Sequence, residues 1–422
     1  MTKVYYAELW GPRQGKYDAL LQTDVSATEW TELEPSSPFY LFVPFQQDLL
    51  GEYQAGWKVT DIFPVSSVGI VTARDHLTIG WCPEEVRDTI SDFASLSPDE
   101  ARERYRLGDD ALDWKVSLAQ KDLRDSGLRS DLIVPILYRP FDVRYTYYTG
   151  HSGGFLCRPR SEVMRHMLRR NVALLCPRRV ETKRPWQHVL SAGETVEHVA
   201  VSLKTIDSVF PLYLYAAEGE MELERGRRPN LSSDFVKSVS ENLALEFVAD
   251  GSGDISETFG PEDVFNYAYA IFHSSTYRKR YAEFLKMDFP RLPLTSDKKL
   301  FQALSAKGAE LVSLHLVESP TLNTFVTRYP VAGSNTVEKV TYDEVNGRVY
   351  INKTQYFEGV TPEIWDFHVG GYQVCQKWLK DRKGRTLSYD DLTHYQKIVV
   401  ALKETIRLME EIDQLIPGWP VE

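Results

Sequence analysis

The sequence IVPILYRPFDVRYTYY, residues 133–148, contains two runs of β-branched and aromatic residues around the short segment Arg139-Pro140-Phe141. Such runs, bounded by polar or turn-forming residues, are typical of β-strands. Similar runs follow, and together they predict strands at Ile133–Tyr138, Asp142–Tyr148, Asn171–Leu175, Glu197–Leu203 and Pro211–Tyr215. We therefore expect a β-rich core over residues 131–260.

A cluster of positive charge lies within this core. Between positions 158 and 184 nine Lys and Arg residues face only Glu162 and Glu181, so the segment carries 9 − 2 = +7 in a chain of net charge −11. The nine residues, the basic cluster, are Arg158, Arg160, Arg165, Arg169, Arg170, Arg178, Arg179, Lys183 and Arg184. Like charges repel, so the usual reason to gather them is a polyanion, and Arg suits both phosphate and guanine edges. The cluster predicts a DNA-binding surface; the alternative is a solvated helix face with ion pairs to the acidic remainder of the chain.

We expect two roles for the basic residues, according to where they lie relative to the predicted strands. We expect Arg178, Arg179, Lys183 and Arg184 to read base edges, because they lie between two predicted strands that can hold them rigidly. The other basic candidates are expected to contact phosphate, and they are Arg158, Arg160, Arg165, Arg169, Arg170 and Arg144. The segment from Tyr138 to Leu203 is then expected to face the major groove.

The composition limits the class of protein. With 422 residues, 43% of them hydrophobic and 26% charged, the chain is long enough for two or three globular domains. The isoelectric point near 5.5 argues against a histone-like coat on DNA. The four cysteines, far apart, predict neither a disulfide framework nor a zinc site. Without a signal peptide or an apolar run long enough for a bilayer, the expected compartment is the cytoplasm, with no membrane partner.

The remaining segments predict an α+β fold in three parts. Residues 1–130 read as a β-rich part, with strands at Val4–Trp10, Phe39–Pro44 and Val68–Ala73 and a helical insertion at about 82–126. Residues 131–260 form the core with its basic loops. Residues 261–422 are expected to hold a helix from Pro261 to about Lys286, a hairpin over 339–353 turning at Asn346-Gly347, and a final helix over 388–416.

Other motifs suggest rival functions. Asp250-Gly251-Ser252-Gly253 could hold the cofactor of a methyltransferase, but the chain has no Asn/Asp-Pro-Pro-aromatic catalytic loop, so a linker is the preferred interpretation. Glu181-Thr182-Lys183, with Asp142, has the residues of a Mg²⁺-dependent nuclease. A non-catalytic scaffold that binds an acidic protein is the third alternative.

Several segments together resemble one family, and their order along the chain makes the resemblance specific. They are YRPFDVRY (138–145), FLCRPR (155–160), VFPLYLY (209–215), YAIFHSSTYR (269–278), FPRLP (289–293) and GGYQV (370–374). They resemble the C-terminal target-recognition region of type ISP single-polypeptide restriction–modification enzymes, over nearly the whole chain from Gly11-Pro12-Arg13 to the last helix.

The resemblance carries expectations about partners and cofactors. A complete enzyme of this kind joins a nuclease, a translocating ATPase, an adenine-N6 methyltransferase and the specificity region. This chain would then bind double-stranded DNA without being an enzyme on its own, hold no cofactor, and leave S-adenosylmethionine to the partner methyltransferase. Met1 would be the start of an isolated fragment, a separate subunit or a truncated gene. The resemblance supplies no catalytic residues for this chain.

Overall fold

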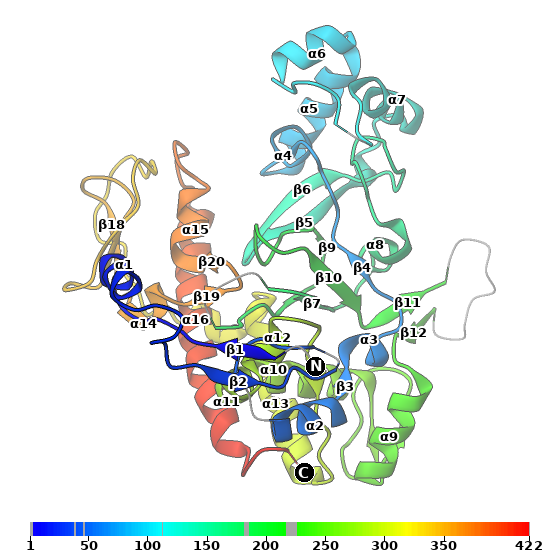
Figure 1. Cartoon of the computed structure of the whole chain (residues 1–422). Helices are drawn as coiled ribbons and strands as arrows, with labels where there is room; N and C mark the ends of the chain where they lie inside the picture. Colours follow the sequence, from blue (N-terminus) through cyan, green and yellow to red (C-terminus); the bar gives the residue numbers. More distant parts are fainter. Residues whose placement is uncertain are drawn as a thin grey trace. The chain divides into compact units, whose positions relative to one another are not determined.

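The β5–β6 ribbon forms the middle of the larger of two compact units, residues 56–422, while residues 1–55 form the smaller unit. The computed structural model describes residues 3–37, 39–44, 47–111, 113–180, 185–216 and 226–421. β5 (Ile133–Arg139) and β6 (Asp142–Tyr147) pair antiparallel as predicted, and the short β9 (Thr195–Val196) runs parallel to β5 (Figure 1). The connecting turn places Phe141 at a φ of 60°. His394 Nε2 lies 2.7 Å from the Phe141 carbonyl oxygen and links this turn to the last helix.

The larger unit also contains a four-stranded antiparallel sheet. Its order is β4-β10-β7-β8, with β4 at Ser67–Val68, β10 at Asp207–Pro211, β7 at Ala173–Pro177 and β8 at Leu190–Ala192. β7 is buried at all five positions. The strand predicted at Asn171–Leu175 is therefore present with a shift of two residues. β11 (Tyr213–Tyr215) pairs antiparallel with β12 (Arg227–Pro229).

The prediction of a strand at Glu197–Leu203 is wrong, because buried carboxylates accept hydrogen bonds from backbone N–H groups of this segment. Glu197 accepts from the amide of Val199 at 3.0 Å, and Asp207 accepts from the amide of Val201 at 2.6 Å. The segment turns instead of pairing along a strand, apart from a single bridge between Glu197 and Ile70.

Short helices follow the first strands of the larger unit. They are α3 (Val59–Ile62), α4 (Asp75–Thr78), α5 (Pro83–Ser95), α6 (Pro98–Arg104), α7 (Val116–Ser126) and η1 (Ser130–Leu132). α5 begins at Pro83 and α6 at Pro98, within the segment of about 82–126 where a helical insertion is expected. Ser97 and Glu100 form a capping box at the start of α6, and Gly127 ends α7 with a φ of 75°.

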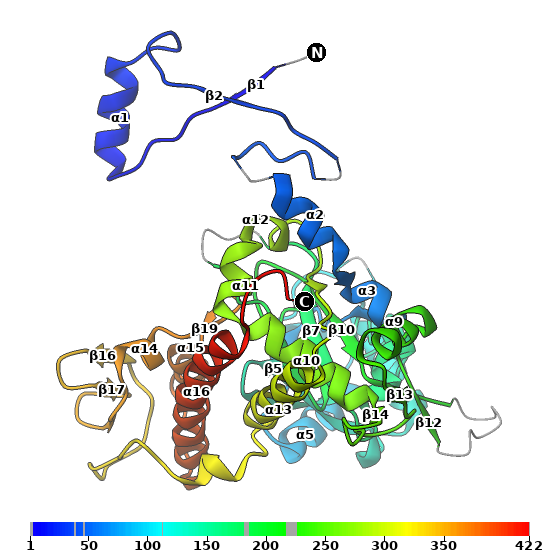
Figure 2. The same ribbon diagram turned by 90° about the horizontal axis from the view of Figure 1, so that it is seen from below.

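The helical half packs around α10 (Pro261–His273), α13 (Lys298–His315) and α16 (Tyr389–Leu415), which lie side by side in Figure 2. α10 and α13 approach closely at Gly308, where an added Cβ would lie 1.8 Å from the Asn266 carbonyl oxygen. The helix predicted from Pro261 to Lys286 is broken into α10, α11 (Ser275–Arg280) and α12 (Ala282–Leu285). The break falls at Ser274, whose hydroxyl caps α11 and donates to Asp413 of α16.

Smaller elements complete the larger unit. The hairpin predicted around Asn346-Gly347 is present as β16 (Thr341–Asp343) and β17 (Arg348–Tyr350), extended by β18 (Tyr356–Glu358). The other elements are β3 (Trp57–Lys58) with β15 (Arg291–Leu292), β13 (Glu246–Phe247) with β14 (Thr258–Phe259), β19 (His368–Val369) with β20 (Tyr372–Gln373), α8 (Ser161–Met167), α9 (Ser233–Leu243), η2 (Pro320–Asn323), α14 (Pro362–Trp365) and α15 (Val374–Lys380). The predicted α+β class is confirmed.

The smaller unit contains β1 (Val4–Tyr6) paired antiparallel with β2 (Thr31–Leu33), α1 (Arg13–Gln22) and α2 (Gln47–Ala55). The strand predicted at Val4–Trp10 ends early. The one predicted at Phe39–Pro44 is wrong, because Tyr40 adopts a φ of 47° that interrupts an extended backbone. Among the residues that the structure describes, no helix has the length and apolar character needed to cross a membrane.

Candidate nucleic-acid interface

The buried strand β7 divides the basic cluster in space. Arg169 and Arg170 precede it, and Arg178 and Arg179 follow it. A five-residue strand is roughly 17 Å long at about 3.4 Å per residue. These four residues of the cluster therefore do not form one patch, because they lie beyond the two ends of a strand whose own side chains are all inside the protein.

The first group lies at the carboxyl end of α8 and consists of Arg165, Arg169 and Arg170, all exposed. The guanidinium of Arg169 lies 5.2 Å from the ring centre of Tyr215, and the Tyr215 hydroxyl donates to the Arg170 carbonyl oxygen. No acid of the described residues forms a salt bridge with any of the three. The three are exposed cations available to an anion, and Arg169 is held beside an aromatic ring.

His166 fixes this group to the sheet. Its Nδ1 accepts a hydrogen bond of 3.0 Å from the backbone amide of Tyr215 in β11. Burial lowers the pKa of His166 to about 4, and the neighbouring Arg165 adds to the effect. The imidazole therefore stays neutral near pH 7 and keeps the lone pair that anchors the helix to the strand.

Arg158 and Arg160 lie at the start of α8. Arg158 Nε is 2.9 Å from Asp113 Oδ2, and both side chains are about half exposed. Water and salt screen such surface pairs, so a phosphate can compete with Asp113. Arg160 caps α8 with a φ of 56°, and its buried Nε has no hydrogen-bond partner within the described part of the chain.

The second group follows β7. The side chain of Arg178 is 62% exposed, and its Nε lies 3.2 Å from Asp288 Oδ1, which also pairs with Lys58 at 2.7 Å. Arg179 is exposed as well. The amide of Val180 donates to the Lys286 carbonyl oxygen and anchors the chain directly after them. Lys183 and Arg184, the other expected base readers, lie outside the described residues.

Arg144 has a different place from the one expected. It is buried, with Nε and Nη2 at 3.1 and 2.8 Å from Asp142 Oδ2, and its guanidinium stacks on Trp81 and Tyr138. A guanidinium held inside the protein in this way does not fit the phosphate contact that the sequence predicted. It stabilises the β5–β6 ribbon instead.

The surroundings of Asp142 also weigh against the nuclease alternative. Its Oδ2 accepts from Arg144, and its Oδ1 accepts from Arg382 at 2.9 Å. Burial by itself would raise the pKa of Asp142, but Arg382 and Arg144 hold it below the ordinary value. Both oxygens of the ionised carboxylate are therefore engaged by guanidinium groups. Glu181 and Lys183, the other members of that motif, lie outside the described residues.

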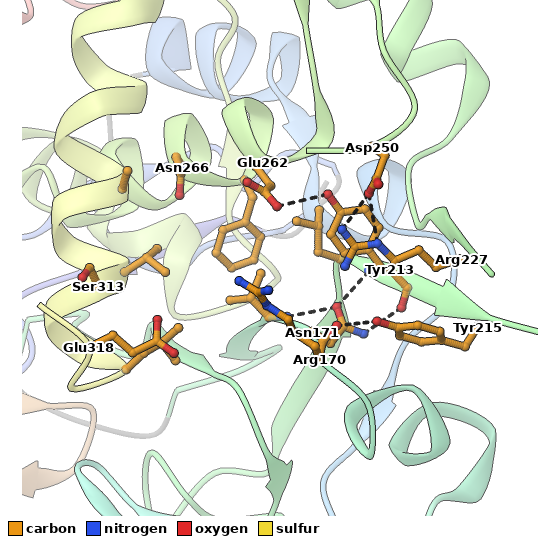
Figure 3. A pocket seen from close by; sticks show the side chains of 16 residues that line it. Arg170, Asn171, Tyr213, Tyr215, Arg227, Asp250, Glu262, Asn266, Ser313 and Glu318 are labelled. Atoms are coloured by element: carbon orange, nitrogen blue, oxygen red, sulfur yellow. Dashed lines mark hydrogen bonds and ion pairs between the residues drawn. The ribbon is translucent and has the colours of Figure 1, made fainter. Parts of the chain in front are cut away.

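The Gly-rich segment expected to be a linker borders a cavity of about 750 Å³ (Figure 3). Asp250 pairs with Arg227 at 2.7 Å, and Arg227 lies 3.7 Å from the ring centre of Tyr213. The Tyr213 hydroxyl accepts from the amide of Gly251 at 2.9 Å. These polar groups bond to one another along the cavity wall, so the segment expected to be a linker is instead held to β11 and β12.

A second basic segment was missed by the sequence analysis. The turn between α15 and α16 contains Lys380, Arg382, Lys383 and Arg385 within six residues. Counting charge in short windows would have found it. Arg382 is buried against Asp142, whereas Lys383 and Arg385 are exposed.

Known proteins with a similar sequence or fold were compared with the chain. Residues 61–411 match the family described as the type ISP C-terminal specificity domain. A comparison with curated proteins gave no significant match.

Three solved structures share the fold. A nuclease-deletion mutant of the type ISP restriction–modification enzyme LlaGI, in complex with a DNA substrate mimic, has a TM-score of 0.67 at 18% identity and is matched by 100% of this chain. A DrdV–DNA complex has a TM-score of 0.69 at 19% identity over 97% of the chain. The ATP-dependent type ISP restriction–modification enzyme LlaBIII bound to DNA has a TM-score of 0.65 at 15% identity over 93%. The chain spans 33%, 43% and 26% of these three chains, respectively. From the family match, which covers most of its length, we conclude that the chain belongs to the type ISP C-terminal specificity domains.

Proposed function

We propose that the chain recognises a short asymmetric sequence of double-stranded DNA, through the major groove, for an adenine methyltransferase carried by another module. The observation that carries this proposal is the set of exposed guanidinium groups at both ends of β7. Arg165, Arg169, Arg170 and Arg179 are without a salt bridge to any described acid. The family membership and the DNA in the related solved structures support the same reading.

Under this proposal the chain positions the DNA and does not itself catalyse a reaction. Arg165, Arg169 and Arg170 contact phosphates and set the register of the duplex, while Arg178 and Arg179 reach base edges. The methyltransferase module supplies S-adenosylmethionine and modifies an extruded adenine. Extrusion costs a few kcal/mol, which DNA binding has to supply. The segment 131–260 carries recognition, and the helices of 261–422 act as spacer and docking surface for the methyltransferase and translocase–nuclease modules.

Selection from a random duplex pool tests the proposal directly. The purified chain is incubated with the pool at low and at physiological salt, and the bound fraction is sequenced. Enrichment of a short asymmetric motif is the expected result. Binding without enrichment would contradict base reading by the isolated chain and leave only a phosphate-tracking surface.

A variant pair adds a control for charge. Replacing Arg165, Arg169, Arg170 and Arg179 with Gln should abolish enrichment at physiological salt. A matched change at Arg129, an exposed arginine paired with Asp131 in another part of the unit, should preserve it. Absence of DNA binding by the unaltered chain at low salt would instead favour an acidic protein as the partner.

A further inference from the structure

Three arginines, one from β6 and two from the turn between α15 and α16, surround one indole. Trp81 lies in the segment that joins α4 to α5, and its ring centre is 3.8 Å from the guanidinium of Arg144, 4.4 Å from that of Arg385 and 4.8 Å from that of Arg382. Figure 1 shows the elements involved, the α4–α5 connection and the turn between α15 and α16, on either side of the β5–β6 ribbon. The Trp81 ring therefore joins these elements through stacked guanidinium groups.

Two of these arginines are already occupied inside the protein. Arg144 and Arg382 share the two oxygens of buried Asp142, and Arg382 also donates to the Trp378 carbonyl oxygen at 3.1 Å. Arg385 differs, because it is exposed and none of the described residues accepts a hydrogen bond from its guanidinium. Its donors point to a ligand outside the chain or to water.

The backbone under Arg385 is held firmly. Its carbonyl oxygen accepts from the amide of Val337 at 2.9 Å, its amide donates to Arg382 at 2.9 Å, and the preceding Gly384 donates to Val337 at 2.7 Å. Stacking on Trp81 restricts the side chain as well. An arginine restricted at both ends loses little conformational freedom when it forms a pair of hydrogen bonds.

The surroundings favour a base edge over a phosphate. A cavity of about 630 Å³ beside the stack is lined by Trp81, Arg382, Arg385 and the acids Asp390 and Asp391. Asp391 accepts from the amide of Ser388 at the start of α16, and its Oδ1 lies 3.8 Å from Arg382 Nε. Acids at this position repel the full negative charge of a phosphate more strongly than the uncharged edge of guanine, which presents two neighbouring acceptors to an arginine fork.

We propose that Arg385, positioned by the stack on Trp81, reads a guanine in the recognised site. This inference rests on the proposed function and adds a second reading element, remote in sequence from the basic cluster. Lys383 is exposed in the same turn, does not line the cavity with the two acids and stacks on no ring of the described residues, so it is the matched residue for phosphate.

The test repeats the duplex selection with Arg385→Gln and Lys383→Gln beside the unaltered chain. We expect Arg385→Gln to lose roughly 5- to 150-fold of the preference for guanine at one position, the range for one bidentate pair. Arg385→Lys should lose it too, because an ammonium lacks the planar fork. Lys383→Gln should keep the motif, weaken binding to all sequences equally and lower the salt slope by about one.

A second pair tests the positioning role of Trp81. Trp81→Leu should reduce the same guanine preference although Arg385 is present, and Trp81→Phe should restore much of it, since a ring face remains. Thermal unfolding of each variant separates this effect from loss of the fold. An unchanged motif in Arg385→Gln, or a reduced salt slope with the guanine preference retained, would overturn the inference while the proposed function stood. An unaltered chain that enriches no motif would overturn both.

Discussion

At the scale of single residues, Asp142 is the charge on which the β5–β6 ribbon and the α15–α16 turn depend. It is buried and receives hydrogen bonds from Arg144 and Arg382, which come from different elements. Removing one member of a buried ion-pair network leaves uncompensated charge, at a cost of about 3–5 kcal/mol.

We therefore expect Asp142→Asn to lower the free energy of unfolding by about 3–5 kcal/mol, as measured by denaturant titration. Asp113→Asn is the matched control, because Asp113 pairs with Arg158 at the surface, where solvent screens the pair and its loss should change the free energy of unfolding little. Equal, small losses in both variants would show that the Asp142 network does not stabilise the fold.

Arg178 and Arg179 test base reading at the same scale. Replacing either with Ala should relax the choice of base at one position of the site, with about 1–3 kcal/mol of discrimination lost. Comparing selected motifs between variant and unaltered chain measures this directly. Uniform weakening across all sequences would assign both residues to phosphate.

At the scale of elements, the carboxyl end of α8 is expected to provide electrostatic affinity without sequence choice. The double change Arg169→Gln with Arg170→Gln removes two exposed cations that form no salt bridge with a described acid, and Arg169 is the one beside Tyr215. The slope of log affinity against log salt should fall by about two, at roughly 0.9 per phosphate contact. Measuring binding of one duplex over a salt series checks it, and an unchanged slope would place both residues away from DNA.

Local signals in the sequence predicted several elements correctly. The Asn346-Gly347 hairpin, the capping box at Ser97 and the helix that starts after Ser388 all depend on nearest neighbours, so the sequence contained the information. The breaks were not local. The segment Glu197–Leu203 turns because the carboxylate of Asp207 accepts a hydrogen bond from one of its backbone amides. The helix after Pro261 ends where the hydroxyl of Ser274 donates a hydrogen bond to Asp413 of α16.

The candidate site, like the elements, was predicted only where it depends on residues that are close in the sequence. Counting charge found the cations of α8 and those after β7, and the strand predicted at Asn171–Leu175 separates them, but the sequence did not show that this strand is buried at every position. It also could not tell that Arg144 faces Asp142 inside the protein, nor that Arg385 stacks on a tryptophan about three hundred positions earlier in the sequence. These facts belong to the tertiary structure.

At the scale of the whole molecule, stability should depend on pH through buried histidines between the long helices. Thr405 gives its hydroxyl hydrogen to Ala401, so it accepts from Nε2 of His315, and Nδ1 of His315 accepts from the Tyr269 hydroxyl. The imidazole is neutral and fully bonded. Burial lowers the pKa of His315 to about 3 from an ordinary 6.5, with Arg278 adding to the effect.

The unfolded chain binds a proton on His315 more strongly than the folded chain does, and this sets the direction in which stability changes with pH. Between pH 6.5 and about 3 the unfolded chain protonates this histidine and the folded chain does not, so the free energy of unfolding falls as pH decreases through that window. Above pH 6.5 the contribution is fully present. We expect His315→Gln to be less stable at neutral pH and to show a shallower decline in acid, as measured by urea unfolding at each pH. A slope equal to that of the unaltered chain would exclude His315 as the titrating group.

The strand β7 also sets a length. Its five residues span about as much as five stacked base pairs, at roughly 3.4 Å each, and Arg170 and Arg178 lie beyond its two ends. Five base pairs are about half a turn of B-form DNA. A duplex lying along the strand would therefore meet the two basic groups on opposite rims of one groove. The length of a buried strand would then set the spacing of the DNA contacts, although none of its atoms touches the nucleic acid.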